Sequence, residues 1–219
     1  QIHTGEELHS STQALKFGLK IISHMNLLTE KIKRNEKIKV VLEQTPAEST
    51  SYRFARLDLR YFSPLSGRVV KGDIASGEIY YTNSTHLNVH APMNPIERVT
   101  NEGKFHPLIE AGSISHIWLG EAQPTKEAIA DFVIKTFRNT RNDQIAFSPE
   151  FTTCNRCHRT SRGLMDTCPY CHSKDVDGIT RITGYFTKVS SWNKGKLGEL
   201  KDRYRNEEYF GHMSYAINE

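Results

Sequence analysis

Four cysteines in two Cys-x2-Cys pairs are the feature that most constrains how this chain can fold. They are Cys154, Cys157, Cys168 and Cys171, and the 219-residue sequence contains no other cysteine. Two sulfurs on one tight turn can bind the same ion, and two such turns complete the tetrahedral four-thiolate shell of a structural Zn²⁺ site. The ten residues between the pairs are slightly fewer than is usual for such ribbons. The array predicts a zinc ribbon over 150–178, with a scaffolding role because no coordination position is left open.

Two other arrangements of the same cysteines stay open, namely a pair of disulfides or a redox-active dithiol. Disulfides persist in oxidising compartments, and no stretch of the sequence resembles a signal peptide. These observations favour zinc over both alternatives and predict a cytoplasmic location. His158 and His172 each follow a cysteine directly, and we expect them to be exposed loop residues and not metal ligands.

A lone glycine, Gly184, lies inside the β-prone run at 179–186. Glycine in a strand costs conformational entropy and contributes no packing, so it usually marks a bulge or a close approach of two backbones. The run is expected to form a strand. A charged helix is expected over 197–205, after the sequence Trp-Asn-Lys-Gly-Lys at 192–196.

The first two thirds of the chain alternate between helix-like and strand-like segments. Apolar periodicity and β-branched runs predict helices over 6–33, 52–59 and 125–139 and strands over 37–44, 113–119 and 143–148. Thr125 is the expected N-cap of the third helix. Residues 61–79 are expected to be irregular, because Pro64 and three glycines interrupt them. This alternation predicts an α/β fold for 1–149.

A hydroxyl-rich loop, Thr45-Pro46-Ala47-Glu48-Ser49-Thr50-Ser51, joins the first predicted strand to the second predicted helix. Backbone N–H groups at a helix start and Ser or Thr hydroxyls can together bind phosphate oxygens. The simpler alternative is a plain N-cap formed by Ser49 or Thr50. Composition alone favours the N-cap.

The overall composition is that of a globular chain. Hydrophobic residues make up 37% and charged residues 25%, so a packed core is expected and wholesale disorder is not. No apolar run is long enough to span a bilayer. A net charge of +4 suits a phosphate-bearing ligand or nucleic acid and proves neither.

Three motifs in succession resemble the carboxyl end of the anaerobic (class III, glycyl-radical) ribonucleoside-triphosphate reductases. They are the four-cysteine ribbon, Arg-Ile-Thr-Gly-Tyr at 181–185, and Trp-Asn-Lys-Gly-Lys at 192–196 followed by a charged helix. The resemblance covers roughly 23–205 and implies that Gly184 carries a stable backbone radical. Such a radical spreads into both flanking amides and needs a flat α-carbon, which a Cβ would crowd. A radical-S-adenosylmethionine activating enzyme with an iron–sulfur cluster is implied as its source.

The resemblance also implies a division of the chain and a substrate site. Residues 1–149 would form the latter part of a ten-stranded α/β barrel, followed by the zinc ribbon at 150–178, the glycyl-radical loop and helix at 179–205, and a tail at 206–219. Residues Thr45, Ala47, Glu48, Ser49, Thr50 and Ser51 would lie against the substrate's phosphates. Glu48 is odd beside phosphate, and we expect it to orient the loop or the ribose side. The Tyr-Thr-Asn-Ser run at 81–84 would line the substrate side of the barrel.

One departure from the family pattern concerns catalysis. The family uses a further cysteine as a thiyl radical that abstracts the substrate's 3′-hydrogen, whereas every cysteine here belongs to the ribbon. The chain is therefore expected to be the carboxyl-terminal part of such a reductase, as a split-gene product, a processed fragment or a truncated form, and to be inactive alone. Its implied partners are the amino-terminal part, the activating enzyme, a ribonucleoside triphosphate and further copies of the same chain, with neither a membrane nor nucleic acid bound directly.

Two other classes of protein remain as alternatives. A zinc-ribbon nucleic-acid-binding protein would use the basic residues near the ribbon, which are Arg156, Arg159, Arg162 and Lys174. Against it, aromatic residues are not clustered on the ribbon as in proteins that bind single strands. A spare glycyl-radical domain without reductase activity would share the motif around Gly184 but would not need the 45–51 loop.

Overall fold

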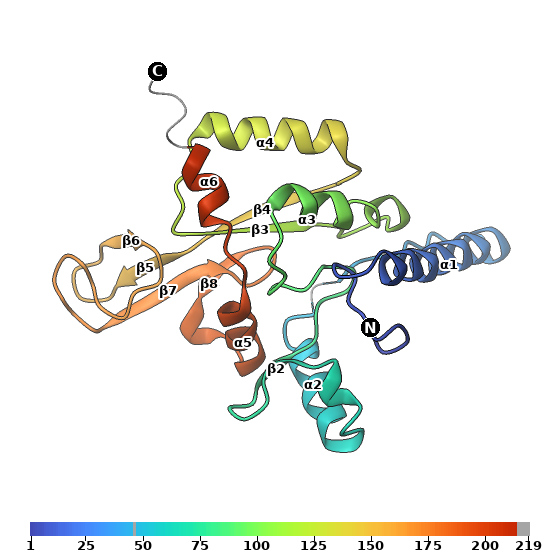
Figure 1. Cartoon of the computed structure of the whole chain (residues 1–219), viewed down its shortest axis with the longest axis horizontal. Coiled ribbons are helices and arrows are strands. Elements are labelled where there is room, and N and C mark those ends of the chain that lie inside the picture. Colours follow the sequence, from blue (N-terminus) through green and yellow to red (C-terminus); the bar gives the residue numbers. More distant parts are fainter. Residues whose placement is uncertain (46, 214–219) are drawn as a thin grey trace.

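The computed structural model describes residues 1–45 and 47–213, which form a mixed α/β fragment (Figure 1). Its helices are α1 (Thr12–Glu36), α2 (Thr50–Tyr61), α3 (Pro95–Glu102), α4 (Lys126–Asn139), α5 (Lys194–Asp202) and α6 (Glu207–Met213). Short 3-10 turns lie at Ser66–Arg68, His106–Leu108 and Val189–Ser191. Within the described residues, no helix is long and apolar enough to cross a membrane.

The strands form three small sheets. Strands β1 (Lys71–Asp73) and β2 (Glu78–Tyr80) make an antiparallel hairpin, and β3 (Ser115–Gly120) pairs in parallel with β4 (Ile145–Pro149). A four-stranded antiparallel sheet has the order β6-β5-β7-β8, with β5 at Phe151–Cys154, β6 at Thr160–Arg162, β7 at Val176–Arg181 and β8 at Phe186–Lys188. Because a single residue, Glu150, separates the end of β4 from the start of β5, the chain passes directly from the parallel pair into this sheet.

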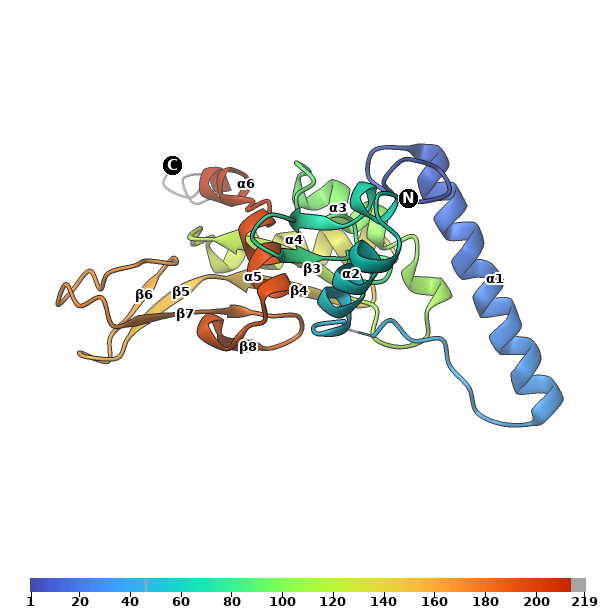
Figure 2. The ribbon, with the colours of Figure 1, turned by 90° about the horizontal axis from the view of Figure 1, so that it is seen from below.

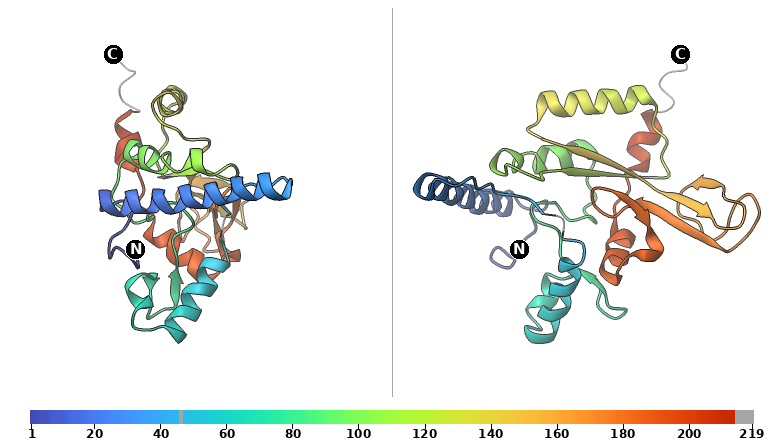
Figure 3. Two further views of the ribbon diagram at one scale, coloured as in Figure 1. Left: turned by 90° about the vertical axis from the view of Figure 1, so that its right-hand side faces the viewer. Right: turned by 180° about the vertical axis from the view of Figure 1, so that it is seen from behind.

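The fragment is elongated, with two projecting ends. Figures 2 and 3 show α1 standing away from the body at one end and the β5–β8 sheet projecting at the other. The body between them packs α3, α4 and α6 around β3. Its main apolar cluster consists of Val99, Ile117, Leu119, Phe132 and Phe210. The first turns of α1 join the body through Leu15, which packs against Phe105 and Ile109.

Helix α5 lies tightly against the β1–β2 hairpin because two of its residues lack a side chain. A Cβ at Gly195 would come within 2.6 Å of the Ile79 carbonyl oxygen, and one at Gly198 would overlap the Glu78 carbonyl. Asn193 caps the helix by accepting a hydrogen bond from the Lys196 N–H at 3.0 Å. This close approach places the remaining face of α5 beside the turn that joins β7 to β8.

Several predicted elements are confirmed with small shifts at their ends. Helix α2 covers the predicted 52–59, and β3 and β4 match the two later strands. The Thr125 hydroxyl accepts a hydrogen bond from the Ala128 N–H at 3.1 Å, which confirms it as the N-cap of α4. The helix predicted over 6–33 begins six residues late, because Ser11 caps it by accepting from the Ala14 N–H.

Two predictions for the amino-terminal region are wrong. Residues 37–44 form no regular strand, because in this run only Glu43 forms a bridge, in parallel with Ala111. Residues 61–79 are not uniformly irregular, because Gly72 and Gly77 adopt left-handed backbone angles that allow the β1–β2 hairpin. Parallel pairing in the described part of the chain is confined to β3–β4 and the Glu43 bridge, so the fragment shows no barrel.

Two predictions for the carboxyl-terminal region are also wrong. The run 179–186 is not one strand, because β7 ends at Arg181 and β8 starts at Phe186, leaving Gly184 in the turn between them. Residues 206–213 are no tail, since α6 forms there and Phe210 is fully buried among apolar residues of α3, β3 and α4. Residues 214–219 of the predicted tail lie outside the described part of the chain.

Candidate functional site

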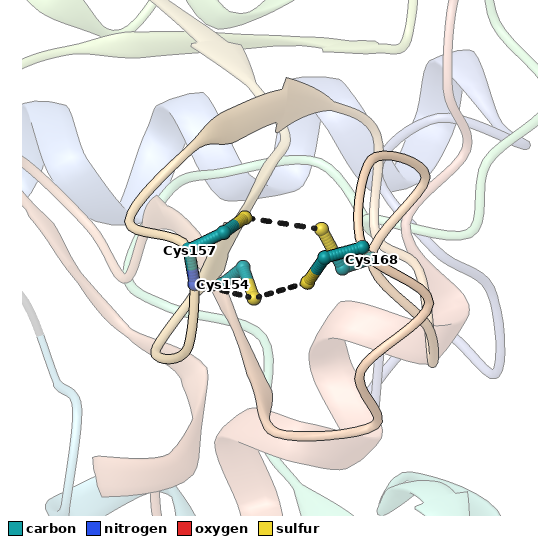
Figure 4. Close-up of side chains that lie close together, drawn as sticks. Cys154, Cys157 and Cys168 are labelled. Atoms are coloured by element: carbon teal, nitrogen blue, oxygen red, sulfur yellow. Dashed lines mark hydrogen bonds between the residues drawn. The ribbon is translucent and has the colours of Figure 1, made fainter.

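The four cysteines converge on one point at the projecting end of the β5–β8 sheet. Their sulfurs all lie within 4.8 Å of one another, with Cys154 Sγ 3.6 Å from Cys171 Sγ and Cys157 Sγ 3.6 Å from Cys168 Sγ (Figure 4). A disulfide would place two sulfurs about 2.05 Å apart, so these are free thiols. A tetrahedral zinc site with bonds of about 2.3 Å has sulfur–sulfur edges of about 3.8 Å. The cluster therefore has the shape of a four-thiolate metal site.

The two Cys-x2-Cys turns share one backbone geometry. His158 and His172 both have φ of 57°, and their N–H groups donate to the carbonyls of Cys154 and Cys168 at 3.0 Å. This left-handed residue reverses the chain after each pair and lets both sulfurs face the same point. Both histidines are exposed, and the group of side chains able to hold a metal contains only the cysteines. The prediction that both histidines are exposed loop residues is confirmed.

The thiols differ in how readily they ionise. Desolvation, which raises the pKa of Cys168, is outweighed by backbone N–H groups of Cys171 and Tyr170 and by neighbouring thiols, so its pKa falls to about 6. A backbone N–H from Ser173 lowers the pKa of Cys171, but desolvation and the surrounding sulfurs raise it to about 12. Four thiolates so close together repel one another, and a divalent cation such as Zn²⁺ removes that conflict.

Gly184 lies in the exposed turn between β7 and β8, where the Ile182 N–H donates to the Tyr185 carbonyl at 3.1 Å. A Cβ built on Gly184 meets nothing within 4 Å, and its φ lies outside the left-handed region that favours glycine. Gly184 therefore marks neither a bulge nor a close approach of two backbones. These were the two structural explanations for a glycine at this position. The packing and the backbone angle of this turn therefore do not require a glycine.

Two arginines hold the backbone on either side of Gly184. Arg181 donates to the Gly184 carbonyl through Nη1 and to the Phe147 carbonyl on β4 through Nε at 3.0 Å. Arg203, just after α5, donates through Nη2 to the Ile182 carbonyl at 3.3 Å. Glu199 accepts from the same guanidinium at 3.1 Å and from the fully buried Lys196 at 2.6 Å. The backbone of the turn is thus held through two of its carbonyl groups.

A cavity of about 230 Å³ opens beside this turn. Gly184 lines it together with Thr183, His86, His116, Trp118 and Arg203. Burial lowers the pKa of His86 and holds the pKa of His116 well below its ordinary value, so both imidazoles are neutral at pH 7. The Nε and Nη1 atoms of Arg203 are buried without a hydrogen-bond partner. The cavity therefore presents neutral rings, one cation whose donors are not all used, and the carboxylates of Glu43 and Glu199.

The Tyr-Thr-Asn-Ser run contributes to the same cavity. Thr82 and Asn83 line it, and Asn83 Oδ1 is buried without a partner. Local sequence gave no reason for this run to face a cavity. Nor did it single out His86, His116 or Arg203, because their burial arises only from packing between segments far apart in the chain.

The 45–51 loop is brought against the Gly184 turn. The Glu48 carboxylate accepts hydrogen bonds from the hydroxyls of Thr183 and, at 3.3 Å, Tyr185. Thr45, Ser49 and Thr50 are exposed, Ala47 is half-buried, and Pro46 lies outside the described residues.

The prediction that the side chain of Ser49 or Thr50 caps α2 is wrong. Ser49 occupies the cap position but its side chain makes no capping hydrogen bond, and α2 starts at Thr50 itself. The buried hydroxyl of Ser51 has no hydrogen-bond partner either. The hydroxyls of this loop are thus not consumed by capping the helix.

Comparison with protein families gives one match over nearly the whole chain. A family model described as anaerobic ribonucleoside-triphosphate reductase matches residues 1–205. Among curated proteins, the anaerobic ribonucleoside-triphosphate reductase of Salmonella typhimurium is 29% identical over 214 residues, covering 92% of this chain and 28% of that protein. The corresponding protein of Enterobacteria phage T4 is 24% identical over 202 residues, covering 87% of this chain and 31% of its own length. The chain thus spans less than a third of these relatives.

Solved structures agree in fold. A structure described as anaerobic ribonucleotide reductase has a TM-score of 0.70 at 22% identity, covering 89% of this chain and 29% of that one. The anaerobic ribonucleotide reductase from Thermotoga maritima in complex with dATP and CTP has a TM-score of 0.65 at 21% identity, covering 86% of this chain and 29% of that one.

Proposed function

Because the chain belongs to the anaerobic ribonucleoside-triphosphate reductase family, we propose that it supplies the radical-bearing portion of such an enzyme. The complete enzyme would convert ribonucleotides to deoxyribonucleotides for DNA synthesis. All four cysteines here sit in the metal cluster, so the cysteine that attacks the substrate as a thiyl radical has to come from the remaining part of the enzyme. The family match favours this function over a nucleic-acid-binding ribbon, and the unexplained hydroxyls of the 45–51 loop favour it over a spare radical domain.

The observation that carries the proposal is the unexplained glycine at position 184. Its α-carbon is exposed at the tip of a turn, has open space where a Cβ would be, and borders a cavity. An activating enzyme that cleaves S-adenosylmethionine at an iron–sulfur cluster would supply the radical that removes one hydrogen from this α-carbon. The resulting centre is flat and shares its unpaired electron with both adjacent amides. Glycine alone permits this without steric cost.

The residues around Gly184 suit the requirements of such a centre. The hydrogen bond from Arg181 to the Gly184 carbonyl fixes the amide into which the electron spreads. The bond from Arg203 to the Ile182 carbonyl holds the preceding segment. Neither arginine blocks the α-carbon, so an activating enzyme can reach it.

The cysteine cluster would hold Zn²⁺ through Cys154, Cys157, Cys168 and Cys171. A zinc ion so bound has no free coordination position and supplies structure, not reactivity. It would fasten the turn that follows β5 to the loop that precedes β7. These two strands pair from Cys154 and Val176 to Phe151 and Ile179, so the metal would set the register of the strand that leads to Gly184.

The 45–51 loop would bind phosphate groups of the substrate. At the start of α2 the Ser51 N–H already donates to the Ala47 carbonyl at 3.1 Å, but a helix start as a whole favours negative charge. The buried Ser51 hydroxyl and the exposed hydroxyls of Thr45, Ser49 and Thr50 would add donors. The loop adjoins the Gly184 turn through Glu48, so bound phosphates would lie close to the radical.

Electron paramagnetic resonance on isotopically labelled protein tests the radical assignment. The chain is expressed with natural glycine or with glycine deuterated at the α-carbon, and each sample is activated anaerobically with a radical-S-adenosylmethionine activating enzyme. A radical at Gly184 keeps one α-hydrogen, so we expect a doublet that collapses to a singlet in the deuterated sample. A doublet that survives deuteration would place the radical elsewhere and refute the proposal. Samples without S-adenosylmethionine serve as the control and should show no signal.

A further inference from the structure

We propose that Glu48 is a positioning residue that couples phosphate binding at the 45–51 loop to the placement of the Gly184 turn. The inference rests on the proposed function of this loop and adds a mechanism that links its two parts. Residues 48 and 184 are 136 positions apart in sequence, and nothing in the sequence connects them.

The two oxygens of the Glu48 carboxylate are divided between the two neighbours of Gly184. Oε1 accepts from the Thr183 hydroxyl and Oε2 accepts from the Tyr185 hydroxyl at 3.3 Å. One carboxylate therefore holds the side chain immediately before Gly184 and the side chain immediately after it. Gly184 has no side chain of its own by which to be held.

The Glu48 backbone is anchored as well. Its carbonyl accepts a hydrogen bond from Asn193 Nδ2 at 3.0 Å, and Asn193 also caps α5. Glu48 is thus a junction between the 45–51 loop, α5 and the Gly184 turn. A shift of the loop backbone is transmitted to the turn through a single residue.

This arrangement explains an acidic side chain in a loop expected to bind anions. Among the ion pairs of the described residues none includes Glu48. Its charge is instead stabilised by the two hydroxyl donors, and its carboxylate is turned toward the Gly184 turn. The negative charge of Glu48 raises the pKa of the Tyr185 phenol. The Tyr185 pKa therefore reports whether the contact with Glu48 is present.

Thr183 is buried, but the two residues that follow it in the turn have little packing of their own and depend on contacts such as that of Glu48. Tyr185 is 56% exposed and Gly184 touches no side chain at its α-carbon face. An anion bound at the start of α2 would fix residues 47–51, and with them the carboxylate that holds the turn. Coupling between two sites is reciprocal, so a phosphate that stabilises the closed turn by some factor must bind the chain with a closed turn more tightly by that factor. Loss of the Glu48 contact removes this gain and is expected to weaken phosphate binding by up to that factor.

Inorganic tripolyphosphate and amide hydrogen exchange test this coupling on the zinc-loaded chain. In the unaltered protein we expect tripolyphosphate to slow exchange at 182–186 by about fivefold, a factor at the low end of typical coupling. In Glu48→Ala this slowing should disappear, and the Kd for tripolyphosphate should rise by about the same factor. Glu48→Gln removes the charge with little change of shape, and NMR of labelled tyrosine should then show the Tyr185 pKa falling toward its ordinary value.

Asp58→Asn is the matched control. Asp58 lies on α2 and accepts from the Tyr81 hydroxyl at 2.8 Å, so it forms the same kind of carboxylate–phenol contact away from Gly184. This variant should bind tripolyphosphate and slow exchange at 182–186 as the unaltered chain does.

Two other results would each decide against the inference. If tripolyphosphate binds and slows exchange equally with and without Glu48, the coupling is overturned and the proposed phosphate loop stands. If the unaltered chain binds no tripolyphosphate, the phosphate role of the loop fails and the coupling fails with it.

Discussion

Replacing Gly184 with alanine separates a structural role for this glycine from a chemical one. A Cβ at this position meets no atom within 4 Å, and φ lies outside the left-handed region in which alanine would be strained. Alanine also restricts the unfolded chain, which at a compatible site raises the free energy of unfolding by about 0.4–1 kcal/mol. For a chain of this size, 1 kcal/mol corresponds to about 2–4 °C in Tm. We therefore expect Gly184→Ala to raise Tm by up to about 4 °C.

Gly72→Ala is the matched control, because Gly72 is also an exposed glycine of a β-hairpin. Its φ is 82°, and a Cβ there would overlap the Glu78 carbonyl on the partner strand. Left-handed backbone and overpacking each cost about 1–3 kcal/mol. The same substitution should thus lower Tm by several degrees at Gly72 while raising it slightly at Gly184.

The assay has two readouts on the same protein. Thermal unfolding of zinc-loaded, reduced protein is followed by circular dichroism without oxygen, and the radical is measured by electron paramagnetic resonance after activation. Gly184→Ala should keep its fold and lose the radical, whereas Gly72→Ala should be less stable and keep it. If Gly184→Ala lowered the free energy of unfolding by more than about 1 kcal/mol, the glycine would have a structural reason and the main support for the radical would be lost.

Three further outcomes follow from the structure. Metal analysis of folded, reduced protein should find about one zinc per chain, and Cys157→Ser should lower this content and expose the β5–β8 amides to exchange. Burial holds the pKa of His116 below its value in the unfolded chain. The contribution of the neutral imidazole to stability is therefore complete above about pH 6.5 and declines as the pH falls. In urea unfolding, the free energy of unfolding should differ less between pH 7.5 and pH 5.5 for His116→Gln than for the unaltered protein. Phe210→Ala should cost about 3–5 kcal/mol in urea unfolding, because that ring is fully buried in the main apolar cluster, and a loss below 1 kcal/mol would show that α6 is dispensable.

Local chemistry allowed part of this structure to be predicted. The cysteine cluster depends on ligand type and spacing within a short segment, and the cap at Thr125 depends on one side chain and the amide three residues later. Both are decided by residues close in sequence. The same reasoning misplaced residues 37–44, since a β-branched run becomes a strand only where a neighbouring strand exists.

The candidate site could be predicted only in pieces. The motif at 181–185 singled out Gly184 but suggested a strand, because β propensity does not show where a hairpin turns. The role of Glu48 could not be found from sequence at all. Its partners are 135 and 137 residues away, and only tertiary contacts, such as the hydrogen bond from Asn193 to the Glu48 carbonyl, bring the two segments together.

In the proposed radical role Gly184 would react at its own α-carbon, which poses a particular problem of positioning. Side-chain packing holds most residues in place, but a glycine that would have to stay open to an activating enzyme could not be packed. The alternatives are its carbonyls and its neighbours, and both are used here: Arg181 and Arg203 bind carbonyls of the turn, and Glu48 binds the two flanking hydroxyls. Each anchor comes from a different segment, so the position of Gly184 depends on the fold as a whole. A metal bound by the four cysteines would fix the register of β5 and β7 at the other end of the sheet and so act on the same problem from a distance, because a register shift of one residue would turn every contact of the turn to the opposite face.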